Sequence, residues 1–353
     1  MSRLVRAVVV VAVLVFTAVV GATACAVNDI VVMPGKNPAA RVPLTDGDVV
    51  VRDRLRTDVV MLASTIGERH VRVPRGLAAA ADFVESELRQ AGYTVVRQSF
   101  TVDGVVCDNL VADWPGAAEK DEIIVVGAHY DSAIGTPGAD DNASGTAAML
   151  ALARQLSTTG KALDRTVRFV AWTNEEPPYF QTEQMGSLVH ARRGQQQGDR
   201  VVAAFSLETL GTYSDVDGSQ AYPFPMNLFY PTTGNFLAFV GESQHRALVA
   251  RSVEVFRGTG LLPAEGAAAP AAIEGVDWSD HWSYGQVGVP GVMVTDTAPF
   301  RTPHYHRATD TPDTLDYDRT ALAVRGLLAV VVDAATVGTR YPGAPIGAAV
   351  WNE

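Results

Sequence analysis

Apolar residues recur along the chain in two periods, one typical of helices and one typical of strands. Helical spacing predicts helices over about 46–68, 74–92, 143–156, 182–193, 243–256 and 317–337. Runs of β-branched, aromatic and other apolar residues predict strands at 93–102, 105–114, 123–126, 167–173, 201–207, 227–230 and 291–294. Because strands and helices alternate, the sequence predicts an α/β fold, a three-layer sandwich with a largely parallel central sheet.

Composition divides the chain into four parts. Residues 1–25 are predicted to be a signal peptide or an N-terminal membrane anchor. Residues 26–45 are rich in proline and are predicted to be a linker. Residues 46–340 are predicted to be a single folded domain, and residues 341–353 a C-terminal tail.

The N-terminal part leaves three interpretations open. Arg3 and Arg6 precede an apolar run from Ala7 to Val20, and small residues lead to Cys25, as in a secretory signal peptide. Cys25 after Ala24 also resembles a bacterial lipoprotein site, and residues 7–27 are long enough to remain in the bilayer as an anchor. All three predict an extracytoplasmic protein, either secreted, lipid-anchored or membrane-anchored.

The net charge and the cysteine content limit the partners and the metal sites that the sequence predicts. The formal net charge is −11, and the sequence has no basic stripe, so a nucleic-acid partner is not expected. The two cysteines, Cys25 and Cys107, lie too far apart for a zinc knuckle, and a disulfide between them stays open. The sequence does not indicate an oligomeric state.

Candidate metal ligands follow several of the predicted strands. Ligands in open α/β sheets bind beyond the carboxyl ends of the strands, so these side chains are expected to share one edge of the sheet. Imidazole and carboxylate groups together suit zinc, with cobalt and manganese as alternatives. The candidates are His129, Asp141, Glu176, Glu208 and His306.

Five motifs carry a family resemblance. The stretches HYDS, GADDNASG, NEE, SLETLG and YHRATDT resemble the M28 family of zinc peptidases, over roughly residues 46–337. The resemblance implies a phosphorylase/hydrolase-like fold of the zinc exopeptidase type. It also implies two Zn²⁺ ions that share one aspartate, and a single ion stays open as an alternative.

Carried over position by position, the resemblance assigns each ligand. Asp141 would bridge the two metals, His129 and Glu208 would complete one, and Glu176 and His306 the other. His306 is preferred to the nearby His304 because it stands four residues before an Asp-Thr pair, as the last ligand of the family does.

The resemblance also assigns catalytic roles. Glu175 matches the general base that takes a proton from water and passes it to the leaving amine. Asp131 matches a carboxylate that accepts the other ring N–H of His129. Tyr305 matches an oxyanion-stabilising tyrosine of some secreted members, although a buried structural tyrosine is an equal alternative. A cis peptide is implied at Asp141–Asn142.

Two positions depart from the better-known members, and a third motif is interpreted as structural. Glu208 stands where the best-known aminopeptidases of the family have aspartate. Pro177–Gln181 reads as an insertion at the rim of the site that shapes substrate access. His281, within Ser-Asp-His, matches a motif near the site and is expected to be structural.

The leading interpretation is therefore an extracytoplasmic dinuclear zinc exopeptidase, an aminopeptidase that acts on a peptide or a small aminoacyl substrate. A carboxypeptidase and a single-zinc glutaminyl cyclase of the same family are the alternatives. A non-catalytic binding ectodomain, from a different class of protein, is also considered. Relatives of that kind typically lack some metal-ligand residues, whereas all five ligand positions of this chain hold side chains that can bind a metal.

Overall fold

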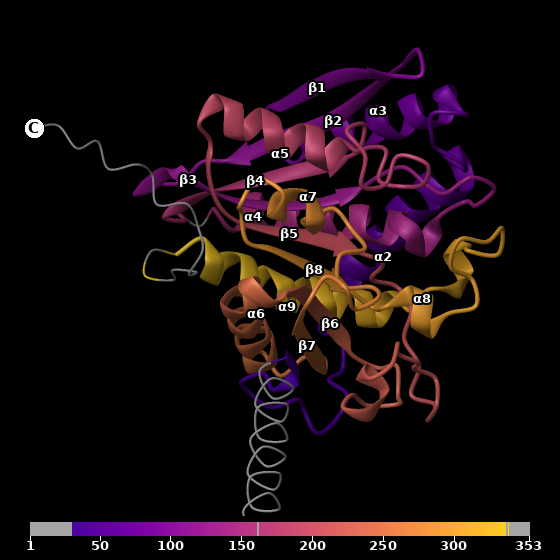
Figure 1. Cartoon of the computed structure of the whole chain (residues 1–353), viewed down its shortest axis with the longest axis vertical. Coiled ribbons are helices and arrows are strands. Elements are labelled where there is room, and N and C mark those ends of the chain that lie inside the picture. Colours follow the sequence, from indigo (N-terminus) through magenta and orange to yellow (C-terminus); the bar gives the residue numbers. More distant parts are fainter. Residues whose placement is uncertain (1–29, 161, 337, 339–353) are drawn as a thin grey trace, which may run out of the picture.

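The computed structural model describes residues 30–160, 162–336 and 338, which form one eight-stranded sheet with helices on both faces (Figure 1). The expected signal peptide or anchor with Cys25, and the expected C-terminal tail, lie outside the described residues. The strands are β1 (Val95–Val102), β2 (Val105–Trp114), β3 (Glu119–His129), β4 (Arg165–Trp172), β5 (Arg200–Glu208), β6 (Leu237–Glu242), β7 (Ala264–Ala269) and β8 (Gly291–Thr295).

The sheet is mixed but has a parallel centre. Its strand order is β1-β2-β4-β3-β5-β8-β6-β7. Strands β4, β3, β5 and β8 are parallel neighbours, whereas β2 and β6 run antiparallel to β4 and β8. The predicted α/β fold with a largely parallel sheet is confirmed.

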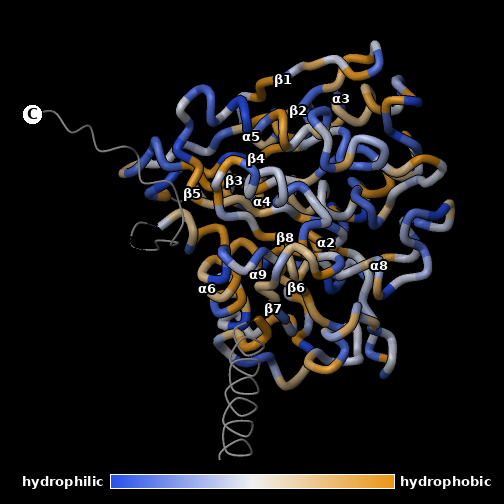
Figure 2. The backbone as a smooth tube through the Cα atoms, in the orientation of Figure 1, coloured by the Kyte–Doolittle hydropathy of each residue, from blue (hydrophilic) through white to orange (hydrophobic). Residues whose placement is uncertain are grey.

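Two helical layers cover the sheet because its buried strands are apolar on both faces. Along β3, Ile124 and Val126 belong to the larger core, and Ile123 and Val125 belong to the smaller core on the opposite face. Figure 2 shows these central strands as mostly hydrophobic. The larger core includes residues of α2 (Asp46–Val60), α3 (Pro74–Gln90), α4 (Gly145–Thr159), α6 (Arg246–Gly258) and α9 (Tyr317–Ala334), and the smaller core includes residues of α5 (Gly186–Gln197) and α7 (His281–Gly285).

Most predicted elements lie within a few residues of the observed ones, but one predicted strand is wrong and four short elements were missed: β6, β7, α7 and α8 (Ala298–Arg301). The strand predicted at 227–230 is wrong, since this segment contains a 3₁₀ turn (Met226–Leu228) within a loop. The next strand along the chain is β6, which begins at Leu237. Strand β7 escaped prediction because its sequence AEGAAA lacks the β-branched residues that mark strands. Helix α7, of five residues, is too short for a periodic signal.

Residues 30–45, expected to form a linker, lie against the domain without long regular structure. Met33 is buried, and the Arg257 side chain of α6 donates hydrogen bonds to the carbonyl groups of Met33 and Pro34. Asn37 donates to the carboxylate of Glu265 on β7. Within the described part of the chain, no helix is both long and apolar enough to span a bilayer.

Candidate metal centre

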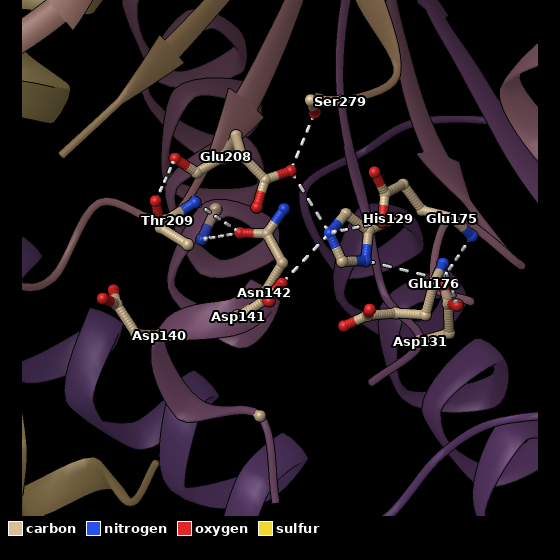
Figure 3. Close-up of polar contacts among 12 residues, drawn as sticks. His129, Asp131, Asp140, Asp141, Asn142, Glu175, Glu176, Glu208, Thr209 and Ser279 are labelled. Atoms are coloured by element: carbon tan, nitrogen blue, oxygen red, sulfur yellow. Dashed lines mark hydrogen bonds and ion pairs between the residues drawn. The ribbon is translucent and has the colours of Figure 1, made fainter. Parts of the chain in front are cut away.

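The candidate ligands gather at one edge of the sheet because three neighbouring parallel strands end there. His129 is the last residue of β3 and Glu208 the last residue of β5. Glu175 and Glu176 follow β4, which pairs with β3. Figure 3 shows these side chains turned toward one another around His129.

Asp141 reaches the same edge on a buried turn between β3 and α4, formed by residues Ala139–Ser144. The carboxylate of Asp310 accepts hydrogen bonds from the backbone N–H groups of Asp140 and Asp141, at 2.8 and 3.1 Å. The Asp141–Asn142 peptide bond is cis, as the family resemblance implied. Asp310 therefore fixes the backbone that presents the Asp141 carboxylate.

The two carboxylate oxygens of Asp141 face different histidines. Oδ1 lies 3.4 Å from His129 Nε2, which is also 3.3 Å from Glu208 Oε2. Oδ2 lies 3.0 Å from His306 Nε2, which is 3.1 Å from Glu176 Oε2. Adjacent ligands of a tetrahedral zinc site are separated by roughly 3.3 Å when the bonds are about 2.0–2.1 Å. The spacing therefore suits two cation sites that meet at Asp141.

The donor set also fits cations in its charge and its hydrogen bonding. The groups that could hold metal ions are His129 with Glu175 and Glu208, and Asp141 with Glu176 and His306. Their four carboxylates carry as much negative charge as two divalent cations can neutralise. Among the described residues, neither ring nitrogen of His129 makes a hydrogen bond of good geometry, and buried Glu176 Oε1 also lacks one. Buried polar atoms of this kind are the usual ligands of a bound ion.

The close packing of buried carboxylates and histidines at the centre shifts their pKa values. Burial would lower the pKa of His129, but the carboxylates of Glu208 and Glu175 outweigh it and raise that pKa above its ordinary value. Burial opposes protonation of His306 as well, and the hydrogen bonds to Asp141 and Glu176 raise its pKa to about 10. Burial and the charge of Asp141 raise the pKa of Glu176 to about 7. The site is a strong attractor of positive charge.

Glu175 lies at the centre without belonging to the Asp141–His306 cluster. Its Oε2 is 3.8 Å from His129 Nε2, and burial raises its pKa well above the ordinary value. Asp131 accepts hydrogen bonds from the backbone N–H groups of Glu175 and Glu176, at 3.2 and 3.3 Å. The same carboxylate lies 3.5 Å from His129 Nδ1. Asp131 thus positions both the histidine ring and the Glu175–Glu176 backbone.

The two candidate histidines, His304 and His306, both lie in the loop after α8 (Ala298–Arg301), but they have different neighbours. His306 faces Asp141 and Glu176, whereas His304 Nδ1 lies 3.0 Å from Thr309 Oγ1. Tyr305 stacks on the His306 ring with centroids 4.0 Å apart, and burial raises the pKa of its hydroxyl. The structure therefore brings His306 and Tyr305 to the centre and leaves His304 outside it.

Several residues at the centre had no assigned role in the sequence. Ser279 donates to Glu208 Oε2 at 2.7 Å, and the neighbouring Asp280 is fully buried, which raises its pKa to about 7. Both belong to the Ser-Asp-His motif, in which His281 Nε2 lies 2.8 Å from the carbonyl oxygen of Val276, a structural contact. Fully buried Arg69 donates to the carbonyl groups of Tyr130, Pro137 and Gly138. Nothing in the local sequence marks Arg69.

Residues 177–181, for which the sequence predicts an insertion that shapes substrate access, follow the Glu175–Glu176 pair and contact two loops. The hydroxyl of Tyr179 donates to Asp103 Oδ2 at 2.7 Å, in the turn between β1 and β2. Gln181 Nε2 donates to the backbone carbonyl and the carboxylate of Asp277, both at 3.2 Å. The segment thus connects two loops that are far apart in the sequence.

An open pocket with a mostly apolar lining and a cavity volume of about 100 Å³ adjoins the centre at Glu208 and Tyr305. Its floor is the sheet face of β8, β6 and β7, which loops cover in place of a helix. Strand register places Glu208, Thr295, Ala238 and Glu265 in one row that runs from the centre across this floor. The pocket walls include Tyr222, Met226, Tyr230, Trp278 and Phe300.

Comparison with known proteins agrees with this geometry. The family model Peptidase family M28 matches residues 109–331. The chain belongs to this family. The Escherichia coli protein YfbL, which is uncharacterized, is 36% identical over 292 residues that cover 79% of the chain and 87% of YfbL.

Solved structures of similar fold include two enzymes of different activity. A zinc aminopeptidase from Bacillus subtilis superposes with a TM-score of 0.65 at 14% identity, over 83% of the chain and 97% of that enzyme. A glutaminyl cyclase from Porphyromonas gingivalis superposes with a TM-score of 0.59 at 18% identity, over 80% of the chain and 98% of that enzyme. At these identities the likeness concerns the fold of this M28 chain.

Proposed function

We propose that this M28 peptidase is an extracytoplasmic dinuclear zinc aminopeptidase. The observation that supports it is the pair of Asp141 oxygens, each of which faces a different histidine and a different glutamate. Asp141 would bridge the metals, with His129 and Glu208 on one side and Glu176 and His306 on the other. Glu208, which stands where the best-known aminopeptidases have aspartate, brings its Oε2 to 3.3 Å from His129 Nε2.

The chain's own residues supply the proton transfer. Bound Zn²⁺ would act as a Lewis acid that polarises the scissile carbonyl and acidifies water. Glu175, buried and with a raised pKa, would take the proton of the attacking water and deliver it to the leaving amine. Asp131 would keep Glu175 and His129 in place through its contacts with the Glu175 backbone and the His129 ring.

Recognition of the N-terminal residue would use the groups that lie between the centre and the apolar pocket. The carboxylates of Glu175 and Glu208 are the candidates to bind the free α-amine of the substrate. Tyr305 lies where the pocket meets the centre and would stabilise the oxyanion. The apolar pocket would receive the first side chain, so we expect large apolar N-terminal residues to be preferred.

Metal analysis combined with a substrate panel tests this proposal. We expect two Zn²⁺ per chain, turnover of leucyl- and phenylalanyl-4-nitroanilide, and no turnover when the amine is acetylated. Glu175→Gln should keep the metal and lose about 10²–10⁴-fold in kcat, the range typical of general-base catalysis. One zinc with cyclisation of N-terminal Gln peptides would indicate a cyclase instead. Release of C-terminal residues would indicate a carboxypeptidase, and absence of any turnover a binding domain.

A further inference from the structure

The loop between β5 and β6 exposes large apolar side chains. Phe224 is 80% exposed, Leu228 64% and Phe229 44%, and Val32 in the N-terminal segment is 52% exposed. We call these four residues the Phe224 surface. Residues 218–241, which contain this loop, have no Asp, Glu, Lys or Arg, although charged residues make up 19% of the chain. Large apolar side chains exposed on an uncharged loop mark a candidate binding face for a protein or a membrane.

The inner side of the same loop already anchors it to the domain. Tyr222 and Tyr230 stack at 5.6 Å, and their hydroxyl groups donate to the carbonyl groups of Pro231 and Gly266 at 2.7 Å each. Met226 is buried in a small apolar core. The loop is therefore held by its inward residues, and the outward Phe224, Leu228 and Phe229 are not needed for that packing.

The described chain begins beside this loop. Ile30 packs against the small core that contains Met226, together with Tyr222 and Tyr230. Figure 1 shows the first described residues, in indigo, at the same lower end of the molecule as the salmon-coloured loop. Residues 7–27 are almost wholly apolar and long enough to span a bilayer. Since Val27 and Ile30 are three residues apart, at most about 11 Å of chain separates such a span from the small core.

We propose that residues 7–27 remain attached as a membrane anchor and that the Phe224 surface lies on the bilayer. The short tether favours lipid over a protein partner, because an anchor ending at Val27 keeps the small core that supports this loop within about 11 Å of chain from the membrane. Phe and Leu side chains on the apolar face of a membrane-bound element become buried at the boundary between the lipid head groups and the acyl chains. Tyr222, Met226 and Tyr230 of the same loop line the apolar pocket, so the pocket wall adjoins the membrane.

A polarity-sensitive fluorophore on the full chain tests this docking. It is attached to Leu228→Cys, with Val106→Cys as the matched control, in a Cys25→Ser background in which Cys107 is buried and unreactive. Val106 is 65% exposed and lies on β2, near the opposite edge of the sheet. The chain is reconstituted into phosphatidylcholine vesicles that carry a nitroxide-labelled lipid.

We expect blue-shifted emission and strong quenching by the nitroxide lipid at position 228, and water-like emission without quenching at position 106. The signal should persist at high salt, because apolar insertion is not screened. Equal emission at the two positions, or a chain that does not bind the vesicles, would overturn the proposal. Phe224→Ser should weaken quenching at position 228 and leave turnover of a soluble aminoacyl-anilide unchanged, so the result is independent of the proposed catalysis.

Discussion

Asp141 is the residue on which the centre depends, because both of its oxygens are used and its backbone is fixed. Asp310 accepts hydrogen bonds from the N–H groups of Asp140 and Asp141, and buried Asn142 donates to the carbonyl group of Leu207. Burial would raise the pKa of Asp141, but the nearby His129 and His306 rings outweigh it and hold that pKa below its usual range. A carboxylate that stays ionised and rigid is suited to hold two cations at once.

The contrast between His306 and His304 gives a test at the residue scale. His306→Ala removes a nitrogen that faces Asp141 and Glu176, so we expect loss of one zinc and a drop in kcat/KM of more than about 100-fold, beyond the 10–100-fold cost of losing an outer-shell partner. His304→Ala, the matched control, should change kcat/KM by less than about 10-fold. Metal content and anilide kinetics measure both, and the reverse order would exclude His306 as the ligand.

At the scale of elements, parallel strands build the centre and the neighbouring antiparallel strand shapes the pocket. Strands β3, β4 and β5 deliver their carboxyl ends to one edge, whereas β6 runs opposite to β8. Register sets Thr295 beside Glu208, and Ala238 beside Thr295. Since neighbouring strands are about 4.8 Å apart, Ala238 lies about 10 Å across the sheet from Glu208. A small residue there leaves room for a long side chain.

Filling this position should change substrate preference. Ala238→Leu is expected to lower kcat/KM for phenylalanyl-anilide by about 10-fold or more, and for alanyl-anilide much less, because methylene-sized changes in an apolar pocket alter discrimination by about 10–200-fold. Ala267→Leu on β7 is the matched control, since Ala267 also lines the pocket but lies one strand farther from the centre. An equal effect on both anilides would place the first side chain elsewhere.

At the scale of the whole molecule, buried titratable groups link stability to pH. His190 is buried in α5, and its Nδ1 lies 2.9 Å from the Tyr284 hydroxyl. Burial lowers the pKa of His190 to about 3 and that of His281 to about 4. The unfolded chain binds these protons near pH 6.5, so this stability is fully present above pH 6.5 and is lost as pH falls toward 3. Burial raises the pKa of Asp296, so this carboxyl group has the opposite effect: its cost to the stability of the fold is relieved as the pH falls.

Substitution of His190 separates its contribution to the pH dependence of stability from the contribution of the buried carboxylates. Between pH 7 and pH 5, His190 alone should cost the native state about 2 kcal/mol of unfolding free energy. We expect His190→Gln to be less stable than the parent at pH 7 but to lose about 2 kcal/mol less on acidification, measured by urea unfolding. Parallel curves for His190→Gln and the parent would show that His190 is not buried in neutral form.

The sequence by itself determined the fold class and the candidate residues of the metal centre. Alternation of apolar periods is a local property, so it predicted the α/β sandwich and placed most helices and strands within a few residues. His129 and Glu208 could be found because each directly ends an apolar run. The family resemblance implied the choice of His306 over His304, because His306 has the spacing to an Asp-Thr pair that the family's last ligand has. The structure places His306 Nε2 beside Asp141.

Tertiary structure alone decided what depends on contacts between distant residues. Arg69 donates hydrogen bonds to carbonyl groups more than 60 positions later, and Asp310 accepts one from the backbone N–H of a residue 170 positions earlier. No local sequence pattern marks either residue. The apolar pocket exists because loops, in place of a helix, cover β8, β6 and β7. The strand wrongly predicted at 227–230 shows the same limit: its apolar residues have β propensity, but their packing against the N-terminal segment and the pocket is non-local.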